Sequence, residues 1–258
     1  MELHLQNRFF IVGGATAGFG GAVANTLLRE GANILAIARN SDKLTELKSH
    51  YPKQVEILAA DITLPETKFH ILEIVGDRYL DGALVNAGGP PAKSFLDTNL
   101  DDWDAAYKNI LRWKVDLTQS LMPKLREQKY GRLVFVESIS VKQPVENLVL
   151  SNSLRPAVVG FVKTLSQEVA RDGITLNILS PGYHNTEAVK RVIKKKSEVT
   201  GMDYQVVEQQ LIKNIPVGRM GEPEEFASIA VWLLSPLSGY ITGQTISVDG
   251  GVMLGIFG

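Results

Sequence analysis

The sequence predicts an α/β protein with a doubly wound (Rossmann) parallel sheet of about seven strands and helices on both faces. Short apolar runs alternate with amphipathic stretches along the whole chain, a pattern typical of parallel strands joined by helical crossovers. The apolar runs are almost continuous in Val, Ile, Leu and Phe, as expected for strands covered on both faces. A glycine-rich loop follows the first run and opens a helical pattern. An eight-stranded α/β barrel fits less well because only about seven strands are counted.

The individual elements follow from these runs. Strands are expected at residues 8–12, 33–38, 55–58, 82–85, 132–136, 175–179 and 245–248. Helices are expected near residues 18–30, 41–50, 65–77, 101–128, 156–171 and 223–235. The helix near 156 is expected to begin at Pro156, because proline fits best in a first helical turn and biases the preceding residue away from helical geometry.

One stretch, residues 184–214, breaks this alternation. It is polar and helix-prone, and it carries five basic residues between positions 190 and 196. In a doubly wound sheet it follows the carboxyl end of a strand, where ligands bind and lids form. We therefore expect one domain over residues 1–258 with a helical lid at 184–214. The basic residues form either a solvated helix face or a docking site for an acidic or phosphorylated substrate handle.

Charge and composition exclude several classes of function. The 258 residues contain 27 Lys and Arg against 28 Asp and Glu, so a net charge of −1 favours neither a nucleic acid nor a membrane surface as partner. The chain has no cysteine, which excludes thiolate metal sites and cysteine nucleophiles, and its four histidines lack metal-ligand spacing. The first residues show no export signal, and no apolar run approaches the roughly 18 residues of a membrane span. We expect a cytoplasmic protein without a metal.

The loop at residues 14–20 reads Gly-Ala-Thr-Ala-Gly-Phe-Gly and lies between the first strand and the first helix. Glycines at these positions permit a tight turn and let backbone N–H groups approach a diphosphate at the helix N-terminus. A structural turn is the other interpretation, but the placement between strand and helix favours dinucleotide binding. The residues expected to contact the dinucleotide are Gly14, Thr16, Gly18, Phe19 and Gly20.

The end of the second strand indicates which dinucleotide is bound. Ala38 and Arg39 stand where an NAD site would place Asp or Glu for the ribose 2′-OH, about 20 residues beyond the glycines. A guanidinium there can pair with a 2′-phosphate and stack on adenine, so NADP(H) is favoured over NAD(H). The alternative is a surface arginine beside the next helix, for which Ser41 is a plausible N-cap.

Further motifs occur after the other strands, and together with the glycine loop they resemble the short-chain dehydrogenase/reductase family. The resemblance covers essentially the whole chain and is nearest to 3-oxoacyl-acyl-carrier-protein reductases, although Gly13 stands where Thr is usual. The residues that carry it are Asp61-Ile62, Asn86-Ala87-Gly88, Asn109 after Trp103, Ser138, Pro181-Gly182 with Thr186, and the closing segments 218–223 and 242–251.

The resemblance implies a role for each of these positions. Asp61 and Ile62 would contact adenine, Asn109 would hold a proton-relay water, and Ser138 would orient the substrate. The remaining residues would bind the cofactor and line its nicotinamide side, namely Asn86, Ala87, Gly88, Pro181, Gly182 and Thr186. The implied reaction is hydride transfer between NADP(H) and a small carbonyl/alcohol pair or an acyl thioester. The apolar tail at 251–258 is interpreted as a subunit interface of a tetramer or dimer, or as a tail packed on its own subunit.

The chain departs from the family at its catalytic pair, Tyr-x-x-x-Lys. Ser151 lies 13 residues after Ser138 and replaces the tyrosine, and Arg155 replaces the lysine. A serine hydroxyl is a poorer acid than a phenol, whereas an arginine stays charged and still binds a ribose or polarises a carbonyl. If the helix begins at Pro156, both residues lie on a loop and the pocket is reshaped.

Three other groups are candidate replacements for the missing acid. Tyr183 and His184 follow the expected nicotinamide loop, and Lys142 lies four residues after Ser138. Each also has a plainer interpretation, as a pocket wall, a lid surface residue and a solvated charge, respectively. The sequence therefore leaves two functions open. The first is an NADP(H)-dependent oxidoreductase with a non-standard acid, in which Asn109, Ser138, Ser151 and Arg155 act. The second is a catalytically impaired NADP(H)-binding sensor or scaffold.

Overall fold

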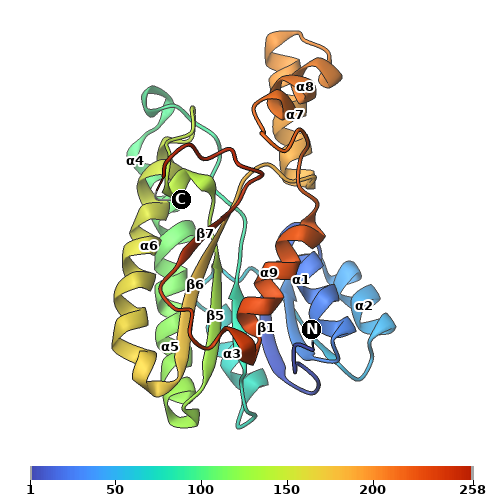
Figure 1. Cartoon of the computed structure of the whole chain (residues 1–258), viewed down its shortest axis with the longest axis vertical. Helices are drawn as coiled ribbons and strands as arrows, with labels where there is room; N and C mark the ends of the chain where they lie inside the picture. Colours follow the sequence, from blue (N-terminus) through green and yellow to red (C-terminus); the bar gives the residue numbers. More distant parts are fainter. Residues whose placement is uncertain (1, 257–258) are drawn as a thin grey trace.

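The computed structural model describes residues 2–256, apart from the side chain of Lys195. A parallel sheet has the strand order β3-β2-β1-β4-β5-β6-β7, which reverses direction between β1 and β4 (Figure 1). This confirms the doubly wound class. The strands are β1 (Phe9–Gly13), β2 (Asn33–Ala38), β3 (Val55–Ala59), β4 (Gly82–Val85), β5 (Gly131–Val136), β6 (Ile174–Pro181) and β7 (Thr245–Val248).

Helices cover both faces of the sheet. Figure 1 shows α1, α2 and α9 on one side and α3, α5 and α6 on the other. The helices are α1 (Gly18–Arg29), α2 (Ser41–His50), α3 (Thr67–Val75), α4 (Leu100–Tyr107), α5 (Trp113–Gln128), α6 (Val149–Val169), α7 (Glu187–Thr200), α8 (Tyr204–Lys213) and α9 (Pro223–Leu234).

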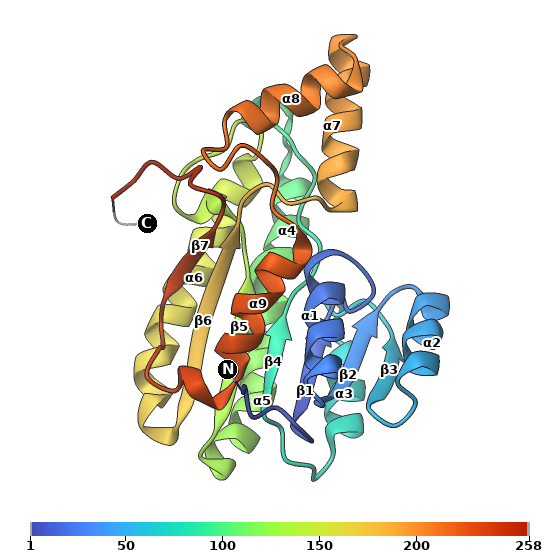
Figure 2. The same ribbon diagram turned by 45° about the vertical axis from the view of Figure 1, so that its right-hand side comes forward.

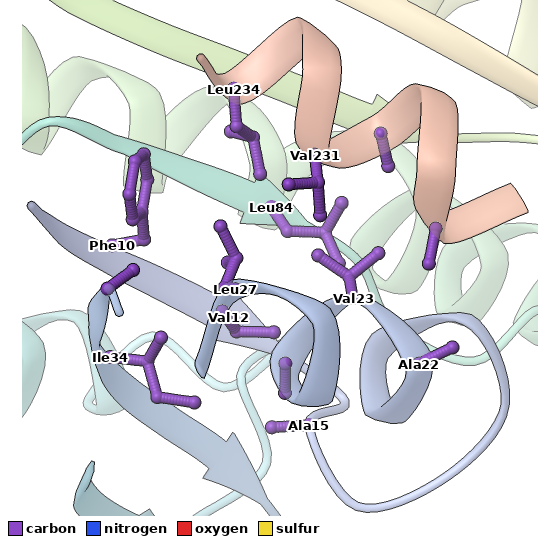
Figure 3. Packing of buried hydrophobic residues seen from close by; sticks show 14 of the residues in the cluster. Phe10, Val12, Ala15, Ala22, Val23, Leu27, Ile34, Leu84, Val231 and Leu234 are labelled. Carbon is purple, nitrogen blue, oxygen red and sulfur yellow. The ribbon is translucent and has the colours of Figure 1, made fainter. Parts of the chain in front are cut away.

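Strand β1, in the interior of the sheet, shows why the sheet needs both helical layers. Successive side chains of a strand point to opposite faces, so Phe10 and Val12 join the core beneath α1 and α9, whereas Phe9 and Ile11 join the core on the other face. Figure 3 shows Val23 and Leu27 of α1 and Val231 and Leu234 of α9 gathered over β1 and β4. Burying each such side chain stabilises the fold by roughly 1.5–3 kcal/mol.

The prediction that the helix near residue 156 begins at Pro156 is wrong. α6 begins at Val149, and Pro156 lies in its interior. Proline removes one backbone hydrogen bond at a cost of roughly 3 kcal/mol, but α6 runs for 21 residues and buries Leu150, Val158 and Val162 against the sheet. Tertiary packing of this apolar face therefore outweighs the local preference of one proline.

Two smaller expectations are also corrected. Ser41 is the first residue of α2 rather than its N-cap, because the side chain of Asn40 accepts a hydrogen bond from Lys43 N at 2.9 Å. The helix expected at 101–128 is interrupted by a π-helical turn, Lys108–Arg112, that separates α4 from α5. Residues 33–38, 82–85 and 245–248 form strands and residues 41–50 form a helix with the expected bounds, and, apart from the start of α6, the remaining boundaries differ by at most two residues.

The stretch that broke the alternation forms α7 and α8. Both helices stand beyond the carboxyl ends of the strands, above the end of β6 (Figure 2). Lys190, Arg191, Lys194 and Lys196 are exposed on α7, while the Lys195 side chain lies outside the described part of the chain. Within residues 2–256, the structure contains no helix that is both long and apolar enough to span a membrane.

Candidate active site

The segments singled out in the sequence gather at one edge of the sheet. They follow β1, β2, β3, β4, β5 and β6, and the carboxyl ends of parallel strands point the same way. In such sheets ligands bind outside this edge, where the strand order reverses. The site therefore lies across the β1–β4 junction, beneath α7 and α8 (Figure 2).

The glycine loop has a conformation that few other residues adopt. Gly14 and Gly18 have φ of +67° and +52°, in the left-handed region. A Cβ on Gly20 would overlap the carbonyl oxygens of Gly13 and Gly14, so the first turn of α1 packs directly on the end of β1. Gly13 itself faces Asn86. The side-chain Nδ2 of Asn86 donates a hydrogen bond to Gly13 O at 3.0 Å, and a Cβ on Gly13 would overlap the backbone carbonyl oxygen of Asn86. A residue with a Cβ at position 13 would therefore crowd the backbone of Asn86 in this structure.

The first turn of α1 fits an anionic group. Its N-cap, Ala17, has no side-chain acceptor. In the part of the chain that the structure describes, the amides of Gly18, Phe19 and Gly20 have no acceptor, while Gly21 N already donates to Ala17 O at 3.0 Å. Unpaired amides at a helix N-terminus, together with the helix dipole, bind phosphate groups. The geometry of this loop therefore fits the diphosphate of a dinucleotide.

The other predicted cofactor residues surround this loop. Thr186, the N-cap of α7, places its methyl group 3.8 Å from the Cβ position of Gly18. Arg39 follows β2 with an exposed side chain that makes no ion pair among residues 2–256. Asp61 accepts from Thr63 N and Oγ1 at 3.0 and 2.8 Å, which fixes its carboxylate at the end of β3. Pro181 ends β6, and Gly182 N donates to Val248 O at 3.0 Å.

Ser151 and Arg155 lie on one face of α6, so the expectation that Pro156 would separate them is wrong. Both are buried, and Arg155 Nε donates to Ser151 Oγ at 2.9 Å. The spacing of four residues brings the two side chains together along the helix. Ser151 and Arg155 therefore form a single hydrogen-bonded unit.

Two buried charges that the sequence analysis missed complete this unit. Glu137 immediately follows β5, and its carboxylate accepts from Arg155 Nη1 at 2.8 Å and also pairs with Lys114 of α5. Burial is the main cause that lowers the pKa of Lys114, and the Glu137 carboxylate opposes it. The sequence signal for them is limited, because Lys114 lies inside the expected helix at 101–128, whereas Glu137 directly follows the expected strand at 132–136.

Ser138 and Asn109 are placed differently. Ser138 is half-buried at the end of β5, next to Glu137, and its Oγ accepts from Ser140 N at 3.2 Å. Asn109 lies in the π-helical turn, a feature often found at functional sites. Its carbonyl oxygen accepts from the indole Nε1 of Trp113 at 2.9 Å, and its exposed side chain lines a small pocket beside Ile62. The residues lining that pocket do not include Ser138 or Ser151.

The three candidate acids have different surroundings. His184 is 2% exposed and packs edge-on against Phe19 at 5.0 Å between ring centroids, so its interpretation as a lid surface residue is wrong. Burial lowers the pKa of His184 and raises that of Tyr183, which makes the phenol a weaker acid near neutral pH. Burial also lowers the pKa of Lys142, against the opposing effect of Asp249.

Comparison with known proteins agrees with this geometry. A family model described as Enoyl-(Acyl carrier protein) reductase matches residues 14–253. The chain belongs to the short-chain dehydrogenase/reductase family. This confirms the resemblance inferred from the motifs, including the resemblance to 3-oxoacyl-acyl-carrier-protein reductases. The 3-oxoacyl-acyl-carrier-protein reductase of Vibrio harveyi is 26% identical, with 98% of this chain and 100% of that protein aligned.

Other short-chain dehydrogenases/reductases are about equally similar. NADPH-dependent reductase BacG of Bacillus subtilis is 27% identical, with 98% of this chain and 100% of that protein aligned. Acetoacetyl-CoA reductase of Shinella zoogloeoides is 31% identical, with 95% and 98% aligned. The crystal structure of L-sorbose reductase from Gluconobacter frateurii, complexed with NADPH and L-sorbose, superposes with a TM-score of 0.92 at 27% identity, covering 99% of this chain and 100% of that one.

Proposed function

We propose that this protein is an NADP(H)-dependent oxidoreductase that interconverts a carbonyl and an alcohol, with Ser151 and Arg155 acting where its family uses tyrosine and lysine. The observation that carries the proposal is the 2.9 Å hydrogen bond from Arg155 Nε to Ser151 Oγ. It keeps a hydroxyl and a permanent positive charge together on α6, and the ion pair of Arg155 with Glu137 links them to the end of β5, at the same edge of the sheet as the glycine loop.

The residues at this edge fit NADP(H), which when bound supplies the hydride. The free amides of Gly18, Phe19 and Gly20 would hold the diphosphate. Arg39 would pair with the 2′-phosphate, since a guanidinium matches phosphate geometry and no carboxylate stands at the end of β2 to bind a 2′-OH instead. Asp61, Ile62, Asn86, Ala87 and Gly88 would enclose the adenine and ribose side. Pro181, Gly182 and Thr186 would enclose the nicotinamide side, and Thr16 would contribute from the glycine loop.

The chain's own groups provide the remaining chemistry. The hydroxyls of Ser138 and Ser151 would donate hydrogen bonds to the carbonyl oxygen, and the Arg155 charge would stabilise the negative charge that develops there. Loss of a tuned general acid typically costs about 10²–10⁴-fold in rate, but positioning and electrostatic stabilisation remain. We therefore favour a working enzyme over a sensor or scaffold.

The substrate class follows from the relatives. Acetoacetyl-CoA reductase and 3-oxoacyl-acyl-carrier-protein reductase are named for acyl thioesters, and L-sorbose reductase for a small ketone. We propose a substrate of one of these kinds. We further propose a cytoplasmic homo-oligomer, a dimer or tetramer of single-domain subunits. In each subunit α7 and α8 would form the lid, and the exposed Leu254 and Ile256 of the tail would pack between subunits.

A cofactor titration followed by turnover tests the proposal. NADPH should raise the melting temperature more than NADH does, and should be oxidised in the presence of acetoacetyl-CoA or a small ketone. Arg39→Gln should weaken NADPH binding by roughly 10–100-fold and leave NADH binding almost unchanged, because a charge-assisted hydrogen bond contributes about 1.5–3 kcal/mol. Arg29→Gln, at the far end of α1, is the matched control.

The possible outcomes separate the competing interpretations. Stabilisation by NADPH without oxidation over a broad panel of ketones and thioesters would favour the sensor or scaffold. Stronger stabilisation by NADH would contradict the role of Arg39. The absence of a shift with either nucleotide would refute both functions.

A further inference from the structure

Three charged side chains meet in the protein interior below the candidate active site. Lys114 of α5 and Arg155 of α6 approach the carboxylate of Glu137 from opposite sides, each pairing with a different oxygen. The Glu137 side chain is fully buried, and those of Lys114 and Arg155 are 4% and 11% exposed. We call these three residues the buried charge array.

The array holds one permanent positive charge. It sets two basic side chains against one carboxylate in a region from which water is largely excluded, but burial lowers the pKa of Lys114, so the permanent charge is that of Arg155. Burying charged groups is costly, and replacing a buried ion network by apolar side chains is often neutral or stabilising. Stability alone therefore gives little reason for the array. A buried positive charge of fixed position is useful where negative charge appears during a reaction.

The array leaves the Arg155 guanidinium little freedom. Nη1 donates to Glu137 at 2.8 Å and Nε donates to Ser151 at 2.9 Å. Nη2 lies against Gly89, where an added Cβ would be only 2.9 Å away. The plane of the guanidinium is thus fixed from three sides, and any residue larger than glycine at position 89 would push against it.

The hydrogen bond to Ser151 also decides what its hydroxyl can do. A serine hydroxyl has one hydrogen to donate and lone pairs that accept. The oxygen accepts from Arg155 Nε, and within residues 2–256 the hydroxyl donates to no acceptor. The positive charge beside the oxygen also favours the form of Ser151 that has given up its proton. Ser151 is therefore held as a donor.

We propose that Glu137 and Lys114 are positioning residues that hold Arg155 so that Ser151 presents its hydroxyl hydrogen to the substrate carbonyl oxygen. This role rests on the proposed function. In the reduction, the carbonyl carbon gains a hydride with its two electrons from NADPH, which becomes NADP⁺, while the C=O π pair moves to the oxygen. That oxygen would take the proton of Ser151 Oγ, and a proton from bulk solvent, passed on through a water molecule, would then restore the serine hydroxyl, so that each turnover consumes one NADPH and one proton. Arg155 keeps its charge throughout and stabilises the transient serine alkoxide.

A double-mutant cycle distinguishes positioning from simple stabilisation. Glu137→Gln should lower kcat for NADPH-dependent acetoacetyl-CoA reduction by about 10–100-fold, within the range of a general acid effect, with KM changing less than about threefold, because binding does not depend on the array. In a Ser151→Ala background the same substitution should cost less than about twofold, since residues that act as a unit are non-additive. Equal losses in both backgrounds, or an unchanged kcat in Glu137→Gln, would overturn the proposal.

Folding is controlled with two further variants. Glu137→Gln leaves two buried basic side chains without a carboxylate partner and should lower the melting temperature, whereas the double variant Glu137→Gln/Lys114→Met removes one of these basic groups and should recover much of it. Its kcat should stay low because Arg155 still lacks its anchor, and recovery of kcat together with stability would contradict the positioning role. Asp81→Asn is the matched control, since Asp81 is another buried carboxylate paired with an arginine, Arg8, at the opposite edge of the sheet. It should cost stability but not kcat.

A spectroscopic measurement tests the geometry without turnover. In ¹⁵N-arginine-labelled protein, the Arg155 Nε–H signal, assigned by its loss in Arg155→Lys, should exchange slowly with solvent. Its exchange should accelerate at least tenfold in Glu137→Gln and stay unchanged in Asp81→Asn, and a fast-exchanging signal in the wild type would refute a fixed guanidinium. A protected signal in a protein that reduces no substrate would refute the proposed function but uphold the positioning. If the protein reduces its substrate but the effects of Glu137→Gln and Ser151→Ala are additive, the proposed function would stand and the positioning role would be refuted.

Discussion

The two halves of the site are fixed by different forces. The cofactor half, built on the loop after β1, is fixed by the main chain, because Gly14 and Gly18 have positive φ and a Cβ on Gly20 would overlap backbone oxygens. The half between β5 and α6 is fixed by side-chain charges that come from three separate elements. The first half depends on glycines whose backbone leaves no room for a side chain, whereas the second depends on contacts between the side chains of Ser151, Arg155, Glu137 and Lys114.

This difference shows which part of a site is free to change. A loop whose atoms touch through the backbone, as at Gly20, tolerates almost no added side chain. α6 holds its geometry through Leu150, Val158 and Val162 even with Pro156 in its interior, so residues 151 and 155 are free to differ.

The largest expected effect comes from breaking the cofactor half. Gly20→Ala introduces a Cβ into the carbonyl oxygens of Gly13 and Gly14, and neither can move without shifting β1 or the loop. Overpacking of this kind costs about 1–3 kcal/mol, and the displaced amides should weaken NADPH binding by roughly 100-fold. Fluorescence titration of NADPH and thermal unfolding measure the two losses.

Gly160→Ala is the matched control for this prediction. Gly160 lies inside α6 with no atom within 4 Å of its Cβ position, and alanine is favoured over glycine in a helix by roughly 0.5–1 kcal/mol. The control should unfold at a slightly higher temperature with unchanged NADPH affinity. Equal affinities for the two variants would show that the steric argument about Gly20 is wrong.

Much of the fold and of the cofactor half was predictable from the sequence, because both depend on local patterns. Residues 33–38, 82–85 and 245–248 form strands with the predicted bounds, since buried parallel strands are short, apolar and bounded by polar residues. The glycines were predictable because their conformational requirement is a property of single residues. The family followed from motifs spread over the whole chain.

The charge array was not predicted, because its members are far apart in sequence. Lys114 and Glu137 are 23 residues apart, and Glu137 and Arg155 are 18 apart, so nothing local joins them. The start of α6 was mispredicted for a related reason. The local preference of Pro156 was read correctly, but the packing of the helix against the sheet, which outweighs it, appears only in three dimensions.

The second prediction tests whether the other half of the site is an eroded form of the family's pair. Ser151→Tyr/Arg155→Lys restores that pair, but the introduced lysine lacks the fork of an arginine, and the buried Glu137 carboxylate should capture its ammonium. We expect a kcat about tenfold below that of the wild type, and partial recovery when Glu137→Ser is added to the double variant. A double variant that outperforms the wild type on the same substrates would contradict this expectation.

The smallest expected effect concerns His184, which packs against Phe19 at the glycine loop and against Phe226 of α9. Burial lowers its pKa in the folded protein below the ordinary 6.5, so the unfolded chain binds more protons. The contribution of His184 to stability is therefore fully present above about pH 6.5 and decreases as the pH falls from there toward the lowered pKa of the folded state.

His184→Gln should remove this pH dependence. Between pH 7.5 and 5.5 the melting temperature of the wild type should fall by a few degrees more than that of the variant, while His70→Gln, an exposed control on α3, should follow the wild type. This pH window avoids Glu225, whose pKa the neighbouring Arg219 lowers to about 2, so that its contribution to stability is lost only below about 4.5. Parallel curves for wild type and His184→Gln would mean that this histidine does not resist protonation. The cofactor half would then be held by its backbone alone, and the contrast with the charged half would be sharper than the aromatic contact suggests.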